Sequence, residues 1–280
     1  MLRGRRGFDL IRDYALPLPT TIIAELLGVP PSDSRRFHRW SSAIVAADAS
    51  AWSAVAALPN MVAFVRYIRR QIDERRNAPR DDLLSALIEA QESEDRLSAD
   101  EIVAMAFLLL IAGHETTVNA IGNGVLALID HPNEMRRLRE GANLDAGIEE
   151  LLRFAGPLDT STERYAAESY QLGDARIHRG DVVYAALASA NRDESHFTAP
   201  DRLDLTRSPN RHIAFGHGIH YCVGAPLARL EMRIAIRQLL NVSDELTLAV
   251  PRAALRWRRG FVLRGLTSLP IKILFRGESR

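Results

Sequence analysis

The chain has 280 residues, 47% of them hydrophobic, which is enough to bury one large core. Its formal net charge of +1 gives no reason to expect a polyelectrolyte partner such as DNA, and its single cysteine excludes an intrachain disulfide and favours a reducing cytoplasm over secretion. No signal peptide, repeat or linker is predicted, so we expect one cytoplasmic domain over residues 1–280, with neither a nucleic acid nor a membrane as partner.

The first part of the chain is predicted to be helical. An irregular stretch is expected at residues 8–19, followed by helices at residues 20–27, 33–46, 53–76 and from 81 onward. Gly28 and Pro30 end the first of these helices. In the third, Phe64, Ile68 and Ile72 recur at helical spacing, as expected of a side that faces a core.

A long helix is predicted from about Ser98 to Ile129. Residues 98–101 have a capping-box pattern, and nearly every residue from 102 to 112 is apolar, so the helix should be buried on most sides. The apolar run stops well short of the ~20 residues that a membrane span needs, because residues 113–117 interrupt it. We therefore expect a core helix of a globular protein.

The interruption itself is unusual for a buried helix. Gly113 costs about 1 kcal/mol relative to alanine inside a helix, and Glu115 brings a charge into an apolar element. Ala112, Gly113 and Thr116 share one face with Leu109 and Ala120, so a flat ligand has room to lie against it beside an alcohol. The alternative is a buried helix with a tolerated polar kink.

Further along, Glu150 and Arg153 lie three residues apart, which places them together on a helix. By spacing alone they form an ordinary surface ion pair. After Arg153 the residue pattern becomes typical of short strands, which are separated by turns at Gly173 and Gly180. Strands are expected at residues 170–172, 175–177, 181–185, 246–250 and 269–274, and a helix from residue 225.

Cys222 lies in the glycine-rich segment 215–224, directly before the last predicted helix. It is a packed thiol, a nucleophile or a metal ligand. The helix dipole and the free amides at a helix N-terminus favour a thiolate, which is a good metal ligand. A zinc site formed by His217, His220 and Cys222 is a further possibility, although it lacks a fourth ligand at the usual spacing.

This segment resembles the haem-ligand loop of the cytochrome P-450 family. That loop has the order Phe, two residues, Gly, one residue, His or Arg, one residue, Cys, one residue, Gly, and Phe215, Gly218, His220, Cys222 and Gly224 fill its fixed positions. Residues 112–116 resemble the oxygen-activating motif of the family, and residues 150–153 resemble its internal Glu-x-x-Arg salt bridge. The three motifs also follow one another in the order found in the family.

The resemblance implies a mainly α fold with a small β-rich portion, and a haem b (iron protoporphyrin IX) cofactor whose iron is bound by Cys222. It implies that Glu115 and Thr116 are catalytic, relaying protons to iron-bound dioxygen. Arg164 and His220 then contact the haem propionates. Phe215, Gly218, Gly224, Ala112 and Gly113 line the cofactor, and Arg202 is the third member of the Glu150–Arg153 network.

The resemblance runs over essentially the whole chain but begins late in the family pattern. The first strands of the family, the loop that roofs the substrate pocket and a propionate-binding helix are missing, so we expect an N-terminally truncated cytochrome P-450 fold. A haem-thiolate monooxygenase that uses dioxygen and a small or medium lipophilic substrate is implied. The alternative is a truncated, non-catalytic relative that keeps the fold and perhaps binds haem.

The implied chemistry needs electrons from another protein, because one cysteine cannot hold an iron–sulfur cluster. The resemblance implies a ferredoxin or flavodoxin with its NAD(P)H reductase. An acidic carrier would suit a basic face, although ordinary solvated helix faces are the alternative for these arginines: 136, 137, 139, 192, 229, 233 and 237. The substrate pocket is expected to lie between the helix before Gly113, residues 158–161 and the loop near Phe261 and Val262.

Overall fold

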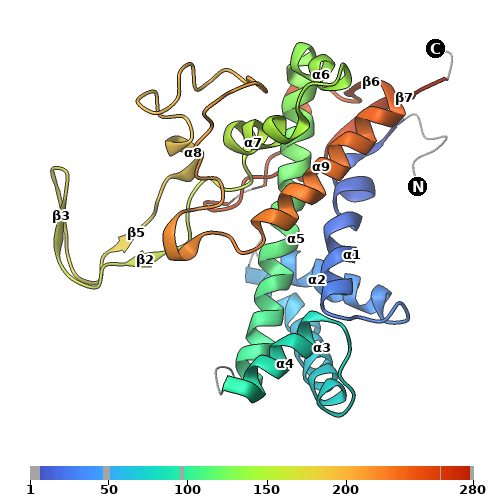
Figure 1. Cartoon of the computed structure of the whole chain (residues 1–280), viewed down its shortest axis with the longest axis vertical. Coiled ribbons are helices and arrows are strands. Elements are labelled where there is room, and N and C mark those ends of the chain that lie inside the picture. Colours follow the sequence, from blue (N-terminus) through green and yellow to red (C-terminus); the bar gives the residue numbers. More distant parts are fainter. Residues whose placement is uncertain (1–6, 47–50, 95–97, 259, 278–280) are drawn as a thin grey trace. The chain divides into compact units, whose positions relative to one another are not determined.

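The structure is a computed structural model that describes residues 7–46, 51–94, 98–258 and 260–277 (Figure 1). Its contacts divide the chain into two compact units. Unit 1 comprises Met1–Ile11 and Asn119–Arg280, and unit 2 comprises Arg12–Val118. The expectation of one domain over residues 1–280 stays a prediction.

Unit 2 is helical, as the apolar periodicity indicates. Its helices are α1 (Pro17–Leu26), α2 (Ser34–Ala46), α3 (Ala51–Asn77), α4 (Leu83–Glu94) and the first part of α5 (Ala99–Asp130). A π-helical turn, Ile11–Ala15, precedes α1 where an irregular stretch was expected. The helices share one apolar core in which Phe37, Phe64, Ile68, Leu84 and Ile102 are buried. The predicted helices are thus confirmed, with ends displaced by a few residues.

A buried ion pair connects three helices of unit 2. The fully buried side chain of Arg75, on α3, lies 2.7 Å from the Asp82 carboxylate just before α4. The same guanidinium donates to the carbonyl of Gly28, after α1, at 2.8 Å. Burial favours a higher pKa for Asp82, but hydrogen bonds from Arg75 and Ser85 hold this pKa below its usual value. Gly28 has a φ of +63°, and a Cβ there would overlap both charged groups.

Helix α5 begins with the predicted capping box. The Ser98 amide donates to Glu101 Oε2 at 2.7 Å, and the Glu101 amide donates to Ser98 Oγ at 3.2 Å. Among the described residues, α5 is long and apolar enough to cross a membrane, with a mean hydropathy of 1.5 over its best window. The length of the apolar run before residue 113 is therefore a poor argument against a membrane span, because a second apolar run follows residue 117. Core helices of soluble proteins pass the same test, so it is weak evidence for a span.

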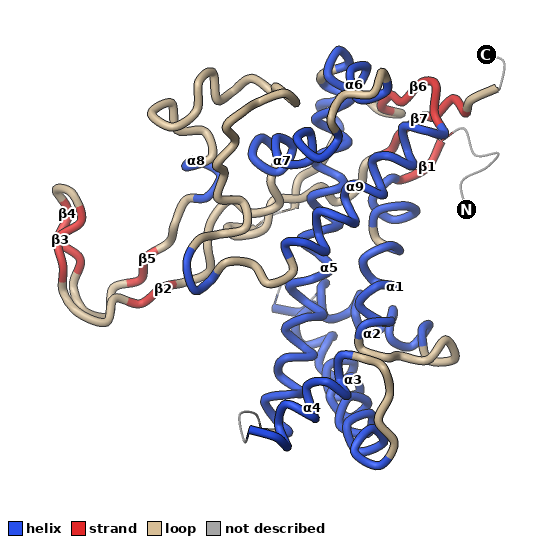
Figure 2. The backbone as a smooth tube through the Cα atoms, in the orientation of Figure 1, coloured by secondary structure: helices blue, strands red, loops and turns tan. Residues whose placement is uncertain are grey.

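Unit 1 combines helices with short antiparallel strands. The helices are α6 (Pro132–Arg139), α7 (Leu144–Ala155), α8 (Leu187–Ala190) and α9 (Ala225–Val242). The strands are β1 (Gly7–Asp9), β2 (Arg164–Tyr165), β3 (Tyr170–Leu172), β4 (Ala175–Ile177), β5 (Val182–Val183), β6 (Ser243–Leu248) and β7 (Pro270–Phe275). The strands pair as β1–β7–β6, β2–β5 and β3–β4, the last forming a hairpin at the tip of an extended segment (Figure 2). The predicted mainly α fold with a small β-rich portion is confirmed.

The helices of unit 1 form the frame for the cysteine segment. Helix α9 packs against α7 (Figure 1). Gly124, on the part of α5 that belongs to unit 1, has Met232, Ile236 and Leu151 as its nearest side chains. Asn123 adds a polar tie, because its amide nitrogen donates to the carbonyl of Arg264 at 2.9 Å. The contacts of Gly124 hold the middle of α9 in place, and the segment with Cys222 directly precedes this helix.

Candidate functional site

The segment before α9 folds into a closed loop around Cys222. The Cys222 amide donates to the Phe215 carbonyl at 2.9 Å, and the Tyr221 amide donates to the Gly218 carbonyl at 3.0 Å. Gly216 and Gly218 have φ angles of +73° and +67°, which L-residues with a side chain rarely adopt. We call residues 212–222 the cysteine loop. Two of its glycines are therefore required by the backbone itself.

The thiol of Cys222 is available to a ligand. It is exposed and lies three residues before the first turn of α9, where the helix dipole stabilises negative charge. Two apolar neighbours are also exposed, Ile219 by 97% and Val223 by 89%. An exposed thiol between exposed apolar side chains suits a flat, apolar group that carries a metal.

The donor set fits haem and does not fit zinc. Among the described residues, no group of three or more His, Cys, Asp or Glu side chains is placed to hold a metal ion. The proposed zinc ligands His217 and His220 therefore do not assemble with Cys222. A thiolate-ligated haem needs only one ligand from the protein, the thiolate sulfur, because the porphyrin supplies the nitrogen ligands of the iron.

The two residues expected at the propionates lie in different settings. His220 is exposed in a short 3₁₀ turn, Gly218–His220. Arg164 lies on β2, and in the described part of the chain its guanidinium donates to Thr162 and Glu163 rather than to the cysteine loop. The structure thus leaves Arg164 bonded to the two residues before its strand, and both propionate contacts stay predictions.

A network that the sequence did not reveal holds the cysteine loop to α7. The Glu149 carboxylate lies 3.0 Å from His212 Nε2 and accepts from Arg229 Nε at 2.6 Å and Nη2 at 2.9 Å. Arg229 also donates to the Tyr221 hydroxyl at 3.2 Å and lies 4.4 Å from the centre of the Phe215 ring. Burial alone favours a higher pKa for Glu149, but hydrogen bonds from His212 and Arg229 lower this pKa to about 2.

The neighbouring Glu150 anchors the segment that leads into the loop. Glu150 and Arg153 are both fully buried, and Arg153 Nε lies 2.8 Å from Glu150 Oε2. The remaining N–H groups of Arg153 donate to the carbonyls of Asn191, Pro200 and Arg202 and to the second Glu150 oxygen. A buried pair with every polar group satisfied fixes local geometry.

The third charged member of this network is Arg207, so the prediction of Arg202 was wrong. Arg207 Nε lies 3.0 Å from Glu150 Oε2, whereas the side chain of Arg202 is exposed and its carbonyl accepts from Arg153. Sequence spacing could not separate the two arginines, because the chain turns between them and brings the later one back to α7. Asn210 completes the set by donating to Glu150 at 3.1 Å.

The predicted catalytic residues lie on α5, in unit 2. Glu115 is buried with 6% exposure, and Thr116 is half-buried with its hydroxyl donating to the Ala112 carbonyl at 2.6 Å. Ala112 is exposed on the same face. The side-chain direction of Gly113, however, is filled by Ile23 of α1, so this glycine serves close helix packing. The roles of Glu115 and Thr116 stay predictions.

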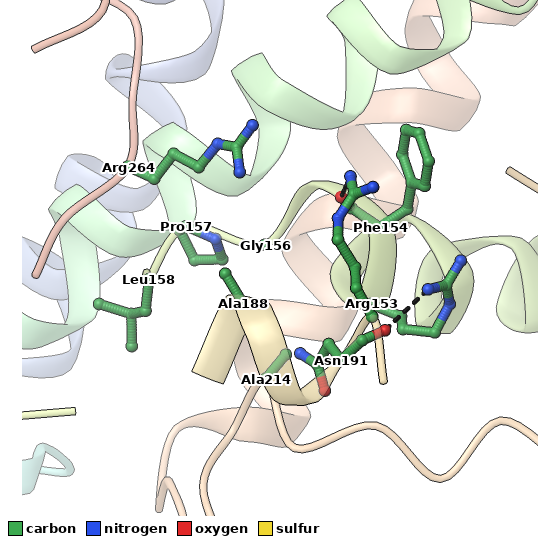
Figure 3. A pocket seen from close by; sticks show the side chains of 10 residues that line it. Arg153, Phe154, Gly156, Pro157, Leu158, Ala188, Asn191, Ala214 and Arg264 are labelled. Atoms are coloured by element: carbon green, nitrogen blue, oxygen red, sulfur yellow. Dashed lines mark hydrogen bonds between the residues drawn. The ribbon is translucent and has the colours of Figure 1, made fainter. Parts of the chain in front are cut away.

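Two of the predicted pocket-lining segments are neighbours in unit 1. The Asp159 amide donates to the Val262 carbonyl at 2.9 Å, and the Thr160 hydroxyl donates to the Phe261 carbonyl at 3.0 Å. Close to these segments in the chain lies a cavity of about 10 Å³, between Arg153, Pro157 and Arg264 (Figure 3). It has room for about one water molecule and is therefore neither a haem nor a substrate pocket.

Most of the arginines considered for a basic face have partners in the structure. Arg137 pairs with Glu134, Arg229 with Glu149, and Arg233 with Asp145. Likewise, Arg192 pairs with Asp201, and Arg139 donates to the Asp244 carbonyl. The four ion pairs reduce the positive charge that a carrier protein would meet.

Comparisons with known proteins agree on one family. The sequence profile of the cytochrome P-450 family matches residues 50–242. The chain is 48% identical over 272 residues to cytochrome P-450 107B1 of Saccharopolyspora erythraea, covering 97% of this chain and 66% of that protein. It is 45% identical to the vitamin D(3) 25-hydroxylase of Pseudonocardia autotrophica, covering 94% and 65% of the two chains.

A solved structure gives the same result. A myxobacterial cytochrome P-450 in complex with myristic acid matches with a TM-score of 0.89 and 46% identity, covering 98% of this chain and 68% of that one. The chain thus spans about two thirds of the length of the curated relatives that it matches. The loop around an exposed Cys222, the buried Glu150–Arg153 pair and these matches have one explanation: the chain belongs to the cytochrome P-450 family, whose cofactor is haem b.

Proposed function

We propose that the chain binds haem b through Cys222 and catalyses the insertion of one oxygen atom of dioxygen into a lipophilic substrate. The observation that carries the proposal is the sole thiol of the chain, exposed at the N-terminal end of α9 between exposed apolar side chains. Haem b, when bound, supplies the iron at which dioxygen is reduced. A thiolate on that iron favours cleavage of the bond between the oxygen atoms.

The protein's own residues position the cofactor and move protons. Cys222 provides the thiolate, and the closed backbone of the cysteine loop keeps it at the start of α9, where the helix dipole stabilises its charge. On α5, the Thr116 hydroxyl carries the proton to be relayed. In the structure this hydroxyl donates a hydrogen bond to the Ala112 carbonyl. Glu115 is the acid in this scheme, and it passes protons through Thr116 toward the reacting oxygen.

The substrate is proposed to be a lipophilic molecule of small or medium size. Support comes from two similar proteins, of which one is a vitamin D(3) 25-hydroxylase and the other was solved in complex with myristic acid. The paired segments at residues 158–161 and 261–263 give one wall of the proposed pocket. Electrons are proposed to come from a ferredoxin or flavodoxin with its NAD(P)H reductase, and the protein to work in the cytoplasm.

The experiment is reconstitution of the purified chain with haemin, followed by reduction and addition of carbon monoxide. A Soret band shifted to the red, typical of thiolate ligation, is expected. The band should revert to an imidazole or neutral-thiol type, or disappear, when Cys222→Ala is tested in parallel. Product formation with a surrogate ferredoxin system then separates a monooxygenase from a non-catalytic relative that merely binds haem. A colourless wild-type chain would contradict the proposal.

A further inference from the structure

Two consecutive glutamates of α7, Glu149 and Glu150, bind different parts of the chain segment that leads to Cys222. Glu150 accepts hydrogen bonds from the Asp204 amide, Arg207 and Asn210. Glu149 binds His212 and, from α9, Arg229. The first carboxylate therefore fixes the chain before the cysteine loop, and the second fixes the two ends of the loop itself.

The contacts of Glu149 reach the loop by two routes. His212 is almost fully buried, and its Nδ1 accepts from the Ala214 amide at 3.2 Å, so the ring proton lies on Nε2 and faces Glu149. Arg229 carries the second route, because its guanidinium covers the Phe215 ring and donates to the Tyr221 hydroxyl. Both routes end on residues next to the hydrogen bond from the Cys222 amide to the Phe215 carbonyl.

We propose that Glu149 is a positioning residue for the cysteine thiolate: through His212 and Arg229 it fixes the conformation in which the cysteine loop presents Cys222. This inference rests on the proposed function and adds to it a residue that acts through His212 and Arg229. The role is distinct from that of Glu150, whose partners end at residue 210. A charge-assisted, two-bond arginine–carboxylate pair is suited to such a task, because it fixes orientation as well as distance.

The chain contains a control on the same two helices, an ion pair that is more exposed than the one formed by Glu149. Asp145, also on α7, pairs with Arg233, also on α9, at 2.9 Å. Arg233 lies one helical turn beyond Arg229, so both pairs join the same two helices. Asp145→Asn removes an interhelical ion pair without touching the cysteine loop, whereas Glu149→Gln removes the pair that touches it.

The first measurement is hydrogen exchange of the peptide that contains residues 215–222, in the haem-free chain. Glu149→Gln is expected to raise the exchange rate of the Tyr221 and Cys222 amides about tenfold or more, the factor that corresponds to losing a hydrogen bond to a charged group. Asp145→Asn should leave this peptide unchanged. Arg229→Gln, which breaks the same pair from its other side, should reproduce the effect and is the second test if Glu149→Gln does not fold.

The second measurement is the spectrum of the reduced, carbon monoxide-treated chain after loading with haemin. Glu149→Gln should shift a large share of the Soret absorbance from the thiolate type to the neutral-thiol type, and Asp145→Asn should not. The positioning role would be overturned if Glu149→Gln and Arg229→Gln showed the same exchange rates and the same spectra as the wild type. A wild-type chain that takes up no haemin overturns the proposed function instead, while the exchange measurement still decides the role of Glu149.

Discussion

The guanidinium of Arg207 lies 3.0 Å from the carboxylate of Glu150, and both side chains are almost fully buried. Arg207 thus shares Glu150 with Arg153, which approaches the carboxylate from its own helix. Two guanidinium groups around one buried carboxylate make the position of residues 204–210 depend on α7. The first prediction follows from this arrangement.

Arg207→Ala should destabilise the fold by about 3 kcal/mol, because it removes one partner from a buried charge cluster. Arg202→Ala should change the free energy of unfolding by less than about 0.5 kcal/mol, since only its carbonyl takes part and that group is retained. Urea denaturation of the two variants measures both values. Equal costs for both substitutions would contradict the assignment of Arg207.

Gly28→Ala should destabilise unit 2 by more than about 3 kcal/mol. The substitution forces a side chain into a backbone conformation with φ of +63° and against the Arg75–Asp82 pair. Gly141→Ala is the control, because Gly141 has a φ of +98° but no atom within 4 Å of the added Cβ, so only backbone strain of about 1–2 kcal/mol is expected. The difference between the two variants in thermal or urea unfolding measures the clash with the ion pair. A cost at Gly28 no larger than that at Gly141 would show that the pair can move aside.

Glu231 should make the fold less stable as the pH rises. Burial raises the pKa of Glu231 from 4.5 to about 7, and among the described residues its Oε2 has no hydrogen-bond partner. The folded protein therefore binds more protons than the unfolded chain between pH 4.5 and 7, so stability falls over this window and stays lower above it.

Glu231→Gln should accordingly gain about 1–2 kcal/mol at pH 8 and little at pH 5. Urea unfolding at the two pH values checks this expectation. The same exchange at the exposed Glu140 should leave the pH dependence as in the wild type. If Glu231→Gln is destabilising at pH 8, the carboxylate has a partner that stabilises its charge.

Thr116→Ala should uncouple electron consumption from product formation in the reconstituted enzyme. Oxidation of NAD(P)H should continue while product falls and hydrogen peroxide rises, because the hydroxyl that is proposed to hold the relayed proton is gone. Thr116→Ser keeps a hydroxyl within reach of the Ala112 carbonyl and should retain most of the coupling. Unchanged product yield in Thr116→Ala would remove this residue from the proton relay.

Local patterns predicted much of this protein. Apolar periodicity located α1 to α5, the capping box at Ser98 and Glu101 fixed where α5 begins, and the glycine pattern around Cys222 identified the segment that folds into a closed loop. These features depend on residues that are close in sequence. The interactions that stabilise these features therefore lie within short segments, and a sequence pattern can reveal them.

The missed features depend on residues that meet only in the folded chain. Strand β1 is three residues long and is defined by its partner β7, so its own sequence gave no sign of it. Arg75 and Asp82 pair across a turn, and Glu149 meets Arg229 across 80 positions. Charged residues at ordinary helical positions favour a solvated face by default. Their burial becomes visible only once the helices are placed against each other.

The pairing of β1 with β7 has a consequence for the order of folding. Residues 7–9 pair with residues 270–272, so this sheet is completed only after residues 270–272 have left the ribosome. The helices of unit 2 pair with near neighbours, as α2 does with α3, and contacts that close short loops form early. During synthesis the helical unit should therefore become protease-resistant first, while the segment that carries the thiol is still being made.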